Sequence, residues 1–405
     1  MDFDFSPEQR QLKDQARRFL ADHCGRSAVR AVLDGPTSFD APLWLGLADQ
    51  GYLGAAIPEA YGGLGAGYAE LCVVAEELGR ALAPVPFSSS IGLAAELLLR
   101  AGTEAQKQRY LPVLASGKLI GTLALAEGPG RVSAASVTSR VSGGLLSGTK
   151  LPVADGDIAD FAVVAAHDGT HDVAPGGGAA ALSQSLSLYL VDLHAAGVKR
   201  EALPSIDPTR SQARIAFTQA AAEPLGGLGA MGAAEATLSA VFDRAAVLMA
   251  FEQLGGADRA LEAACAYAQE RFAFGRPIGS LQAIKHLLAD MYVSATLARS
   301  NAYYGAWALS TDSTELPEAA ATARVSATQA YQHCARNSLQ VHGGMGFTWE
   351  FDCHLHYRRA NLLALALGSL SRWEDLLIER LRDRQSERRL TEREHIERRA
   401  QASAA

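Results

Sequence analysis

The hydrophobic pattern of the chain changes twice along its length, and these changes limit the possible folds more than any other feature. From Ser6 to about Ser116 apolar residues recur at helical spacing, beginning with the capping serine and early proline of Ser6-Pro7-Glu8. From about Leu119 to Phe217 short apolar runs alternate with Gly, Ser and Asp, which is typical of β-strands. From about residue 231 long helical units return. This order predicts an α+β protein with a strand domain between two helical ones.

We expect domains at residues 1–118, 119–228 and 229–385, because a chain of 405 residues exceeds what one hydrophobic core usually serves. The helices of the first domain should include 66–83, 88–101 and 104–115. The third domain should contain four long helices, which favours a bundle, at roughly 231–272, 281–311, 315–341 and 351–383.

Two segments carry too little apolar surface to pack firmly. Residues 386–405 are mostly Arg, Glu and other polar types, and we interpret them as a solvated tail, with a protein-binding segment as the alternative. The Gly-, Ala- and Ser-rich stretch His171–Ser185 predicts a mobile loop.

The composition argues against several classes of protein. A hydrophobic share of 48% and a charged share of 20% are ordinary for a soluble protein, and the net charge of -7 speaks against nucleic-acid binding, which needs a basic surface. Five scattered cysteines without a CxxC pair indicate reduced thiols. The N-terminus lacks an apolar signal core, and no apolar run is long enough to cross a bilayer. We therefore expect a cytoplasmic protein with no membrane or nucleic-acid partner.

The segment Tyr267–Met291 carries residues suited to gripping a dinucleotide. Arg271 offers a planar, permanently charged fork that can bind a pyrophosphate through paired hydrogen bonds, and Phe274 offers a flat face for an adenine. The alternative for Arg271 alone is a solvated charge at a helix end.

A second segment, Gln340–Arg359, offers complementary chemistry. Gly343 and Gly344 have no side chain, so backbone N–H groups there can approach an anion closely, and Gln340 can both donate and accept a hydrogen bond. The alternative for the two glycines alone is a plain helix stop. Taken jointly, the two segments predict a clamp for a dinucleotide.

Both segments match, in order and spacing, the two C-terminal signatures of the acyl-CoA dehydrogenase family of flavoproteins, which the chain resembles over nearly its whole length. The resemblance implies an N-terminal helical domain, a middle β-barrel and a C-terminal four-helix bundle, with FAD as cofactor. It also implies that a set of clamp residues reaches across a dimer interface to hold the FAD of the neighbouring subunit. This set comprises Arg271, Phe274, Gln282, Gln340, Gly343 and Gly344.

The implied reaction removes two hydrogens across the Cα–Cβ bond of an acyl-CoA thioester. A carboxylate takes the α-proton while the flavin N5 accepts a hydride from Cβ, and the electrons pass to an acceptor flavoprotein. In relatives the base is a glutamate in an EGT or EGS segment, where this chain has Leu367. Other relatives carry it on the first long helix of the bundle, where this chain has Ala245. Asp243 and Glu252 are acids on the same predicted helix as Ala245. Both are more typical of structural roles, and Asp243 is the better alternative candidate for the catalytic base.

The segments that face the flavin in relatives depart from the family pattern as well. The TEPxAGSD-like stretch is replaced by Ala126–Ser133, and the W-I-T/S triplet, whose ring covers the flavin, by Pro152-Val153-Ala154. An alignment slip is the alternative, but no tryptophan occurs between Trp44 and Trp307.

Two further motifs resemble a cofactor-binding or metal-binding pattern, but we interpret both as structural. Gly227–Gly232 matches GxGxxG but lacks the alternating strands and helices of a dinucleotide-binding fold, so we interpret it as a flexible entry to the bundle. His354 and His356 lie near Cys353, but no second ligand cluster is evident, and we expect no metal site.

These observations predict a subunit of a heteromeric acyl-CoA dehydrogenase, resembling the subunits without a base in actinobacterial enzymes that act on steroid side chains and other bulky acyl-CoAs. Its partner would be a homologous subunit, in a dimer or heterotetramer. One alternative is an active homo-oligomeric dehydrogenase with an unusual base. Another is a cofactor-free scaffold or binding protein that keeps only the fold.

Overall fold

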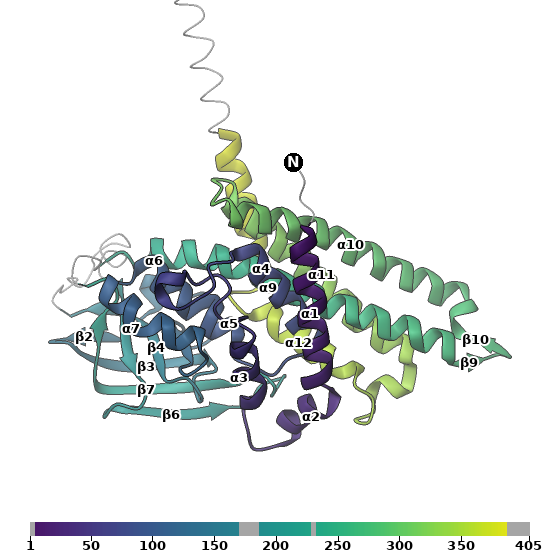
Figure 1. Cartoon of the computed structure of the whole chain (residues 1–405), viewed down its shortest axis with the longest axis horizontal. Helices are drawn as coiled ribbons and strands as arrows, with labels where there is room; N and C mark the ends of the chain where they lie inside the picture. Colours follow the sequence, from purple (N-terminus) through teal and green to yellow (C-terminus); the bar gives the residue numbers. More distant parts are fainter. Residues whose placement is uncertain (1–4, 170–185, 228–231, 387–405) are drawn as a thin grey trace, which may run out of the picture.

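The computed structural model describes residues 5–169, 186–227 and 232–386. The predicted loop His171–Ser185, the centre of the Gly227–Gly232 motif and nearly all of the predicted tail lie outside these ranges. The three-part organisation predicted from the hydrophobic pattern is confirmed, with helices, a sheet and then helices again (Figure 1).

The first domain is built from helices whose starts are set by local sequence. Ser6 and Gln9 form a reciprocal capping box at the start of α1, and Thr103 and Gln106 form another at the start of α7. The predicted helices at 66–83 and 104–115 are confirmed, and the one at 88–101 contains a π-helical stretch, η2. The elements are α1 (Pro7–His23), α2 (Arg26–Asp34), α3 (Ala41–Asp49), η1 (Glu59–Tyr61), α4 (Tyr68–Ala81), α5 (Phe87–Ser89), η2 (Ser90–Ala95), α6 (Glu96–Ala101) and α7 (Glu104–Ala115).

The middle domain is an eight-stranded sheet with the order β6-β7-β3-β2-β4-β5-β8, and β1 pairs with β4. β4 and β5 are the most apolar strands and are almost wholly buried. Among the pairings given by the described residues, β6 and β8 stand at the two ends of the sheet. The strands are β1 (Gly121–Ala124), β2 (Arg140–Ser142), β3 (Leu145–Ala154), β4 (Phe161–Asp168), β5 (Leu186–Asp192), β6 (Val198–Leu203), β7 (Gln212–Ala221) and β8 (Glu223–Pro224). The short helix η3 (Ala134–Ser136) lies between β1 and β2.

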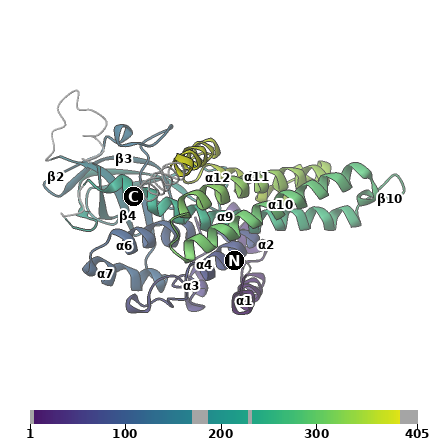
Figure 2. The same cartoon turned by 90° about the horizontal axis from the view of Figure 1, so that it is seen from above.

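Long helices that pack side by side form the C-terminal domain, and they extend away from the sheet (Figure 2). Three of them agree with the predicted helices to within a few residues. They are α9 (Ala234–Glu270), α10 (Gln282–Ser310), α11 (Leu316–His342) and α12 (Cys353–Leu365), with η5 (Ile278–Ser280) before α10 and η6 (Gly343–Phe347) after α11.

The predicted single helix at 351–383 is wrong, because the chain breaks it at residues 366–369 and resumes a helix at 370–386. Leu367 and Gly368 have φ values of 59° and 102°, which a helix does not allow. The buried guanidinium of Arg324 donates to the carbonyl oxygens of Leu363 and Ala366 and so satisfies the end of α12.

The N-terminal domain contacts the bundle mainly through α4 and α9, which approach closely at two glycines. A Cβ at Gly79 would lie 1.9 Å from the carbonyl oxygen of Glu252, and a Cβ at Gly255 would lie 1.8 Å from that of Glu76. Only glycine permits this crossing, which places α9 against the first domain. None of the helices within the described ranges is long and apolar enough to cross a membrane.

Candidate functional site

The first predicted clamp segment forms the outer tip of the bundle. Arg271 follows the last turn of α9, and its backbone N–H donates to the carbonyl oxygen of Tyr267 at 2.9 Å. The hairpin of β9 (Phe272–Ala273) and β10 (Arg276–Pro277) then turns the chain into α10. Phe274 stands at the turn with a φ of 56° and is 91% exposed. The flat ring is therefore free on the surface of this chain.

The second predicted clamp segment lies at the same end of the bundle, where α11 stops. Gly343 has a φ of 60°, and an ideal Cβ at Gly343 or Gly344 would meet no atom of the described residues within 4 Å. Their backbone is therefore open to a ligand. Gln340 is exposed on the last turn of α11, and Gln282 is exposed on the first turn of α10.

An aromatic contact joins the two segments. The ring of Tyr267, one turn before Arg271, stacks on His342, which precedes Gly343, with ring centroids 4.3 Å apart. The structure thus brings together the ends of α9 and α11 and the start of α10. A fork for a pyrophosphate, an exposed ring and an open glycine backbone suit the diphosphate and adenine of FAD.

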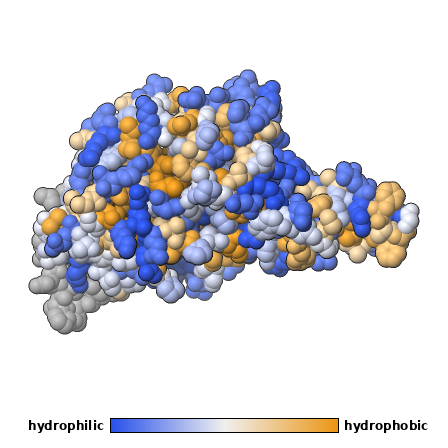
Figure 3. Space-filling model, turned by 90° about the horizontal axis from the view of Figure 1, so that it is seen from below, coloured by the Kyte–Doolittle hydropathy of each residue, from blue (hydrophilic) through white to orange (hydrophobic). Residues whose placement is uncertain are grey.

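This end of the bundle and the middle of α10 expose large apolar side chains. Figure 3 shows hydrophobic surface gathered at the tip. Single exposed apolar residues are normal, but a group on neighbouring elements is typical of an interaction surface. The exposed apolar residues on the hairpin, α10 and the loop after α11 are Phe272, Phe274, Tyr292, Val293, Leu297, Met345, Phe347 and Trp349.

The two predicted base positions, Leu367 and Ala245, line one small cavity between α9, the first domain and the break after α12. Its volume is about 10 Å³, which is close to the lower limit for a single water molecule. Most of its other lining is apolar, from Ala75, Phe87, Gly92, Leu93, Leu248 and Met249. Neither position can accept a proton, and this cavity leaves no room for an acyl chain.

Glu252 is the carboxylate on the lining of this cavity, and both of its oxygens have polar partners within the protein. Its Oε2 accepts from Ser88 Oγ at 2.9 Å, and its Oε1 accepts from Arg210 Nη2 at 2.5 Å and lies 3.3 Å from Arg359 Nη1. Both oxygens of this carboxylate are therefore already occupied by donors from Ser88, Arg210 and Arg359. Its position favours a structural role.

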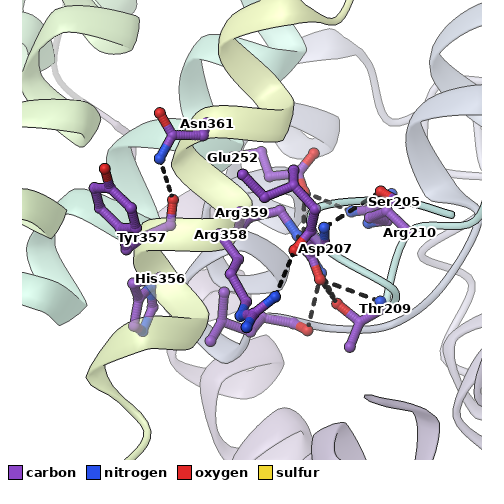
Figure 4. Close-up of polar contacts among 12 residues, drawn as sticks. Ser205, Asp207, Thr209, Arg210, Glu252, His356, Tyr357, Arg358, Arg359 and Asn361 are labelled. Atoms are coloured by element: carbon purple, nitrogen blue, oxygen red, sulfur yellow. Dashed lines mark hydrogen bonds and ion pairs between the residues drawn. The ribbon is translucent and has the colours of Figure 1, made fainter. Parts of the chain in front are cut away.

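The same network continues from the bundle into the sheet domain (Figure 4). Arg359 of α12 is fully buried, and it donates through Nε to Asp207 Oδ2 at 2.5 Å and through Nη2 to Thr209 Oγ1 at 2.8 Å. Burial raises the pKa of Asp207, but the Arg359 charge and the hydrogen bonds outweigh burial and leave that pKa below its ordinary value. Two arginines and two carboxylates, together with Ser88 of the first domain, thus join all three domains beside the cavity.

Asp243, the alternative candidate for the catalytic base, does not line the cavity. Its Oδ1 accepts from Arg380 Nη2 at 2.7 Å, on the helix at 370–386. Burial raises the pKa of Asp243 to about 6, against the opposing charge of Arg380. The structure therefore does not bring Asp243 together with Ala245 and Leu367.

The loop between β1 and β2 is held by contacts within the chain. Glu127 Oε1 accepts from the fully buried Lys150 Nζ at 2.7 Å, and its Oε2 accepts from the backbone N–H of Thr138 at 2.7 Å. Burial raises the pKa of Glu127, but the hydrogen bonds from Lys150, Thr138 and Ser139 outweigh burial and lower it to about 2. Pro152, at the predicted position of the flavin-covering ring, is an exposed proline.

Two models of the acyl-CoA dehydrogenase family match the chain, the N-terminal domain over residues 6–118 and the C-terminal domain over residues 231–381. The acyl-CoA dehydrogenase IpdE2 of Mycobacterium tuberculosis is 34% identical over 365 residues, which cover 90% of this chain and 94% of the relative. The chain belongs to the acyl-CoA dehydrogenase family. It is therefore a member of a family of oxidoreductases.

Solved structures of the acyl-CoA dehydrogenase family are similar over the whole fold. The ChsE4-ChsE5 complex from Mycobacterium tuberculosis matches with a TM-score of 0.81 and 27% identity, covering 94% of this chain and 99% of that chain. A variant of the Tcur3481-Tcur3483 steroid ACAD matches with a TM-score of 0.80 and 29% identity, with the same coverage. Both have two differently named components.

The sequence did not reveal the Arg359 network, because Arg359 and Asp207 are 152 positions apart in the chain. The pattern Asp207-Pro208-Thr209, in which Asp207 accepts from the Thr209 backbone N–H at 3.1 Å, is a turn signal and no more. His356, one of the two histidines weighed as metal ligands, is buried against the Tyr331 hydroxyl at 3.0 Å, and burial lowers its pKa to about 3. Within the described ranges no group of three potential ligands could hold a metal ion.

Proposed function

We propose that this chain is a subunit of a heteromeric acyl-CoA dehydrogenase and completes the FAD site of a partner subunit instead of supplying the catalytic base. One observation carries the proposal. Leu367 and Ala245 converge on one small apolar cavity, while the clamp residues at the other end of the bundle are exposed and turned away from the chain's own core.

The clamp side suits a partner's cofactor. Arg271 would pair with the pyrophosphate, Gly343 and Gly344 would offer backbone N–H groups, and Phe274 would cover the adenine. A bound FAD would supply the hydride acceptor for the reaction, and an acceptor flavoprotein would then take the electrons. The apolar side chains around the clamp would be buried by the partner, since such a surface is seldom left open.

The chain's own site lacks the matching parts. No ionisable side chain occupies either base position, and Glu252 is held by two arginines and a serine. The tether of Glu127 to Lys150 and the exposed Pro152 offer no ring to cover a flavin. The base and the well-held flavin would come from the partner.

Two relatives support the partner and the substrate class. The ChsE4-ChsE5 structure is a complex of two components, and the Tcur3481-Tcur3483 protein is described as a steroid ACAD. By likeness to them we propose a homologous acyl-CoA dehydrogenase subunit as partner, in a dimer or heterotetramer, and a bulky, steroid-type acyl-CoA as substrate.

Flavin content tests the proposal against its alternatives. The chain purified alone should hold little FAD and oxidise no simple acyl-CoA, whereas co-expression with an adjacent acyl-CoA dehydrogenase gene product should give a yellow complex with dye-reducing activity. A yellow, active chain on its own would establish a homo-oligomeric enzyme and refute the proposal. Colourless protein under both conditions would favour a scaffold.

The clamp itself is tested by Arg271→Ala in the assembled complex. Loss of a charge-assisted pyrophosphate contact removes roughly 1.5–3 kcal/mol, so FAD affinity should fall about tenfold or more. Arg276→Ala is the matched control, because Arg276 is an exposed arginine in the same hairpin. Equal FAD dissociation constants for both variants would show that Arg271 is only a solvated helix-end charge.

A further inference from the structure

The two clamp glycines stand at the start of a loop that links α11 to α12. Neither glycine has a side chain to anchor it, and ideal Cβ atoms there would be in open space among the described residues. Both glycines belong to the short helix η6, and the orientation of their N–H groups depends on this turn and on how the segment is held at its two ends, His342 and Asp352.

The near end is held by aromatic packing. His342 stacks on Tyr267 and meets Phe351 edge-on, with centroids 4.3 Å and 5.6 Å away, and its Nδ1 lies 2.7 Å from the carbonyl oxygen of Ser338. These contacts fix the last residue of α11 and tie it to α9.

The far end is held by a different domain. Arg30 of α2 donates through Nε to Asp352 Oδ1 at 2.8 Å, and its Nη2 donates to the backbone carbonyl of Trp349. These partners lie more than 300 positions along the chain from Arg30, so the contact joins the N-terminal domain to the clamp loop. A planar guanidinium serves the two acceptors with separate nitrogens held in a fixed geometry, whereas a lysine would have to reach both from one ammonium nitrogen.

Arg30 is the better-shielded of two arginines on Asp352. Its side chain is 23% exposed and that of Asp352 is 18% exposed, whereas Arg26, with Nε 3.2 Å from Asp352 Oδ2, is 76% exposed. A partly buried, hydrogen-bonded ion pair resists salt and solvent better than an exposed one. Arg26 therefore provides a matched control on the same carboxylate.

We infer that Arg30 is a positioning residue for the Gly343-Gly344 backbone. By fixing Trp349 and Asp352, it limits the conformations of the glycine-containing loop and so presents the N–H groups to a diphosphate in one orientation. This inference rests on the proposed clamp, and it adds that the first domain, which does not touch the cofactor through this contact, sets cofactor affinity. Pre-ordering a loop raises affinity because less conformational entropy is lost on binding.

Hydrogen exchange of the chain alone tests the ordering. Arg30→Gln should speed amide exchange in residues 340–352 about fivefold or more, because the far anchor is lost, while exchange in α10 stays at its wild-type rate. Asp352→Asn should do the same, and Arg26→Gln should not. Unchanged exchange in both Arg30→Gln and Asp352→Asn would overturn the inference, whatever the fate of the proposed clamp.

FAD dissociation from the assembled complex tests the consequence. Arg30→Gln should raise the FAD dissociation constant roughly three- to tenfold, and Arg30→Lys should give an intermediate value because it keeps the charge but not the fork. A structural role alone would lower the melting temperature without this graded effect on flavin release. If Arg271→Ala weakens FAD binding and Arg30→Gln does not, the positioning role is wrong and the clamp stands. If neither variant weakens it, the clamp itself is wrong.

Discussion

Replacing Arg359 by leucine should destabilise this protein strongly. The guanidinium is fully buried and touches Asp207 Oδ2 at 2.5 Å and Thr209 Oγ1 at 2.8 Å. Leucine leaves the Asp207 carboxylate buried without its cation, whereas Glu252 keeps Arg210. Breaking one side of a buried ion pair costs about 3–5 kcal/mol, a large share of the roughly 5–15 kcal/mol by which proteins are stable.

Thermal unfolding at neutral pH measures this loss. At roughly 2 °C per kcal/mol for a chain of this size, the melting temperature should fall by about 6–10 °C. Arg358→Leu is the control, because Arg358 is the neighbouring residue and loses only a hydrogen bond to the Ile206 carbonyl and a contact with the Trp349 ring. That variant should lose about 1 kcal/mol or less.

A second variant examines the cause. Adding Asp207→Asn to Arg359→Leu removes the stranded charge and should recover part of the lost stability. The reasoning fails if Arg359→Leu and Arg358→Leu melt together, or if the double variant melts below Arg359→Leu.

Two further changes are expected to have defined effects. The pKa of Asp243 is raised from 3.8 to about 6, so the folded state keeps a proton that the unfolded chain has released, and wild-type stability falls as pH rises through that window. Asp243→Asn should therefore gain stability relative to wild type between about pH 4 and pH 7, and melting curves with a constant offset would contradict this. Gly255→Ala should lose roughly 1–3 kcal/mol, because its methyl group would lie 1.8 Å from the Glu76 carbonyl oxygen. Gly92→Ala, whose Cβ would meet only Leu248 at 3.9 Å, should melt close to wild type, and equal losses at both glycines would refute the packing argument.

Local sequence determined the elements of the fold. The capping serine before α1 and the threonine before α7 each form their hydrogen bonds with residues three positions away. The starts of these helices can therefore be predicted without the rest of the chain. The change from helical to strand periodicity marked the three domains for the same reason. The break between α12 and the helix at 370–386 could not be predicted from local sequence. It depends on the left-handed backbone of Leu367 and on Arg324, which lies more than 35 positions earlier.

The sequence by itself determined which residue types are present: no ionisable group at Leu367 or Ala245, and a fork, a ring and two glycines in the predicted clamp. Only the tertiary structure decided that the two predicted base positions line one small cavity, that Asp243 lies outside it, and that Arg30 reaches the loop of the predicted clamp. The physical reason is the distance along the chain between the residues that interact. Caps, turns and periodicity arise from neighbours within a few positions, whereas a cavity and a buried ion pair exist only after packing brings distant side chains together.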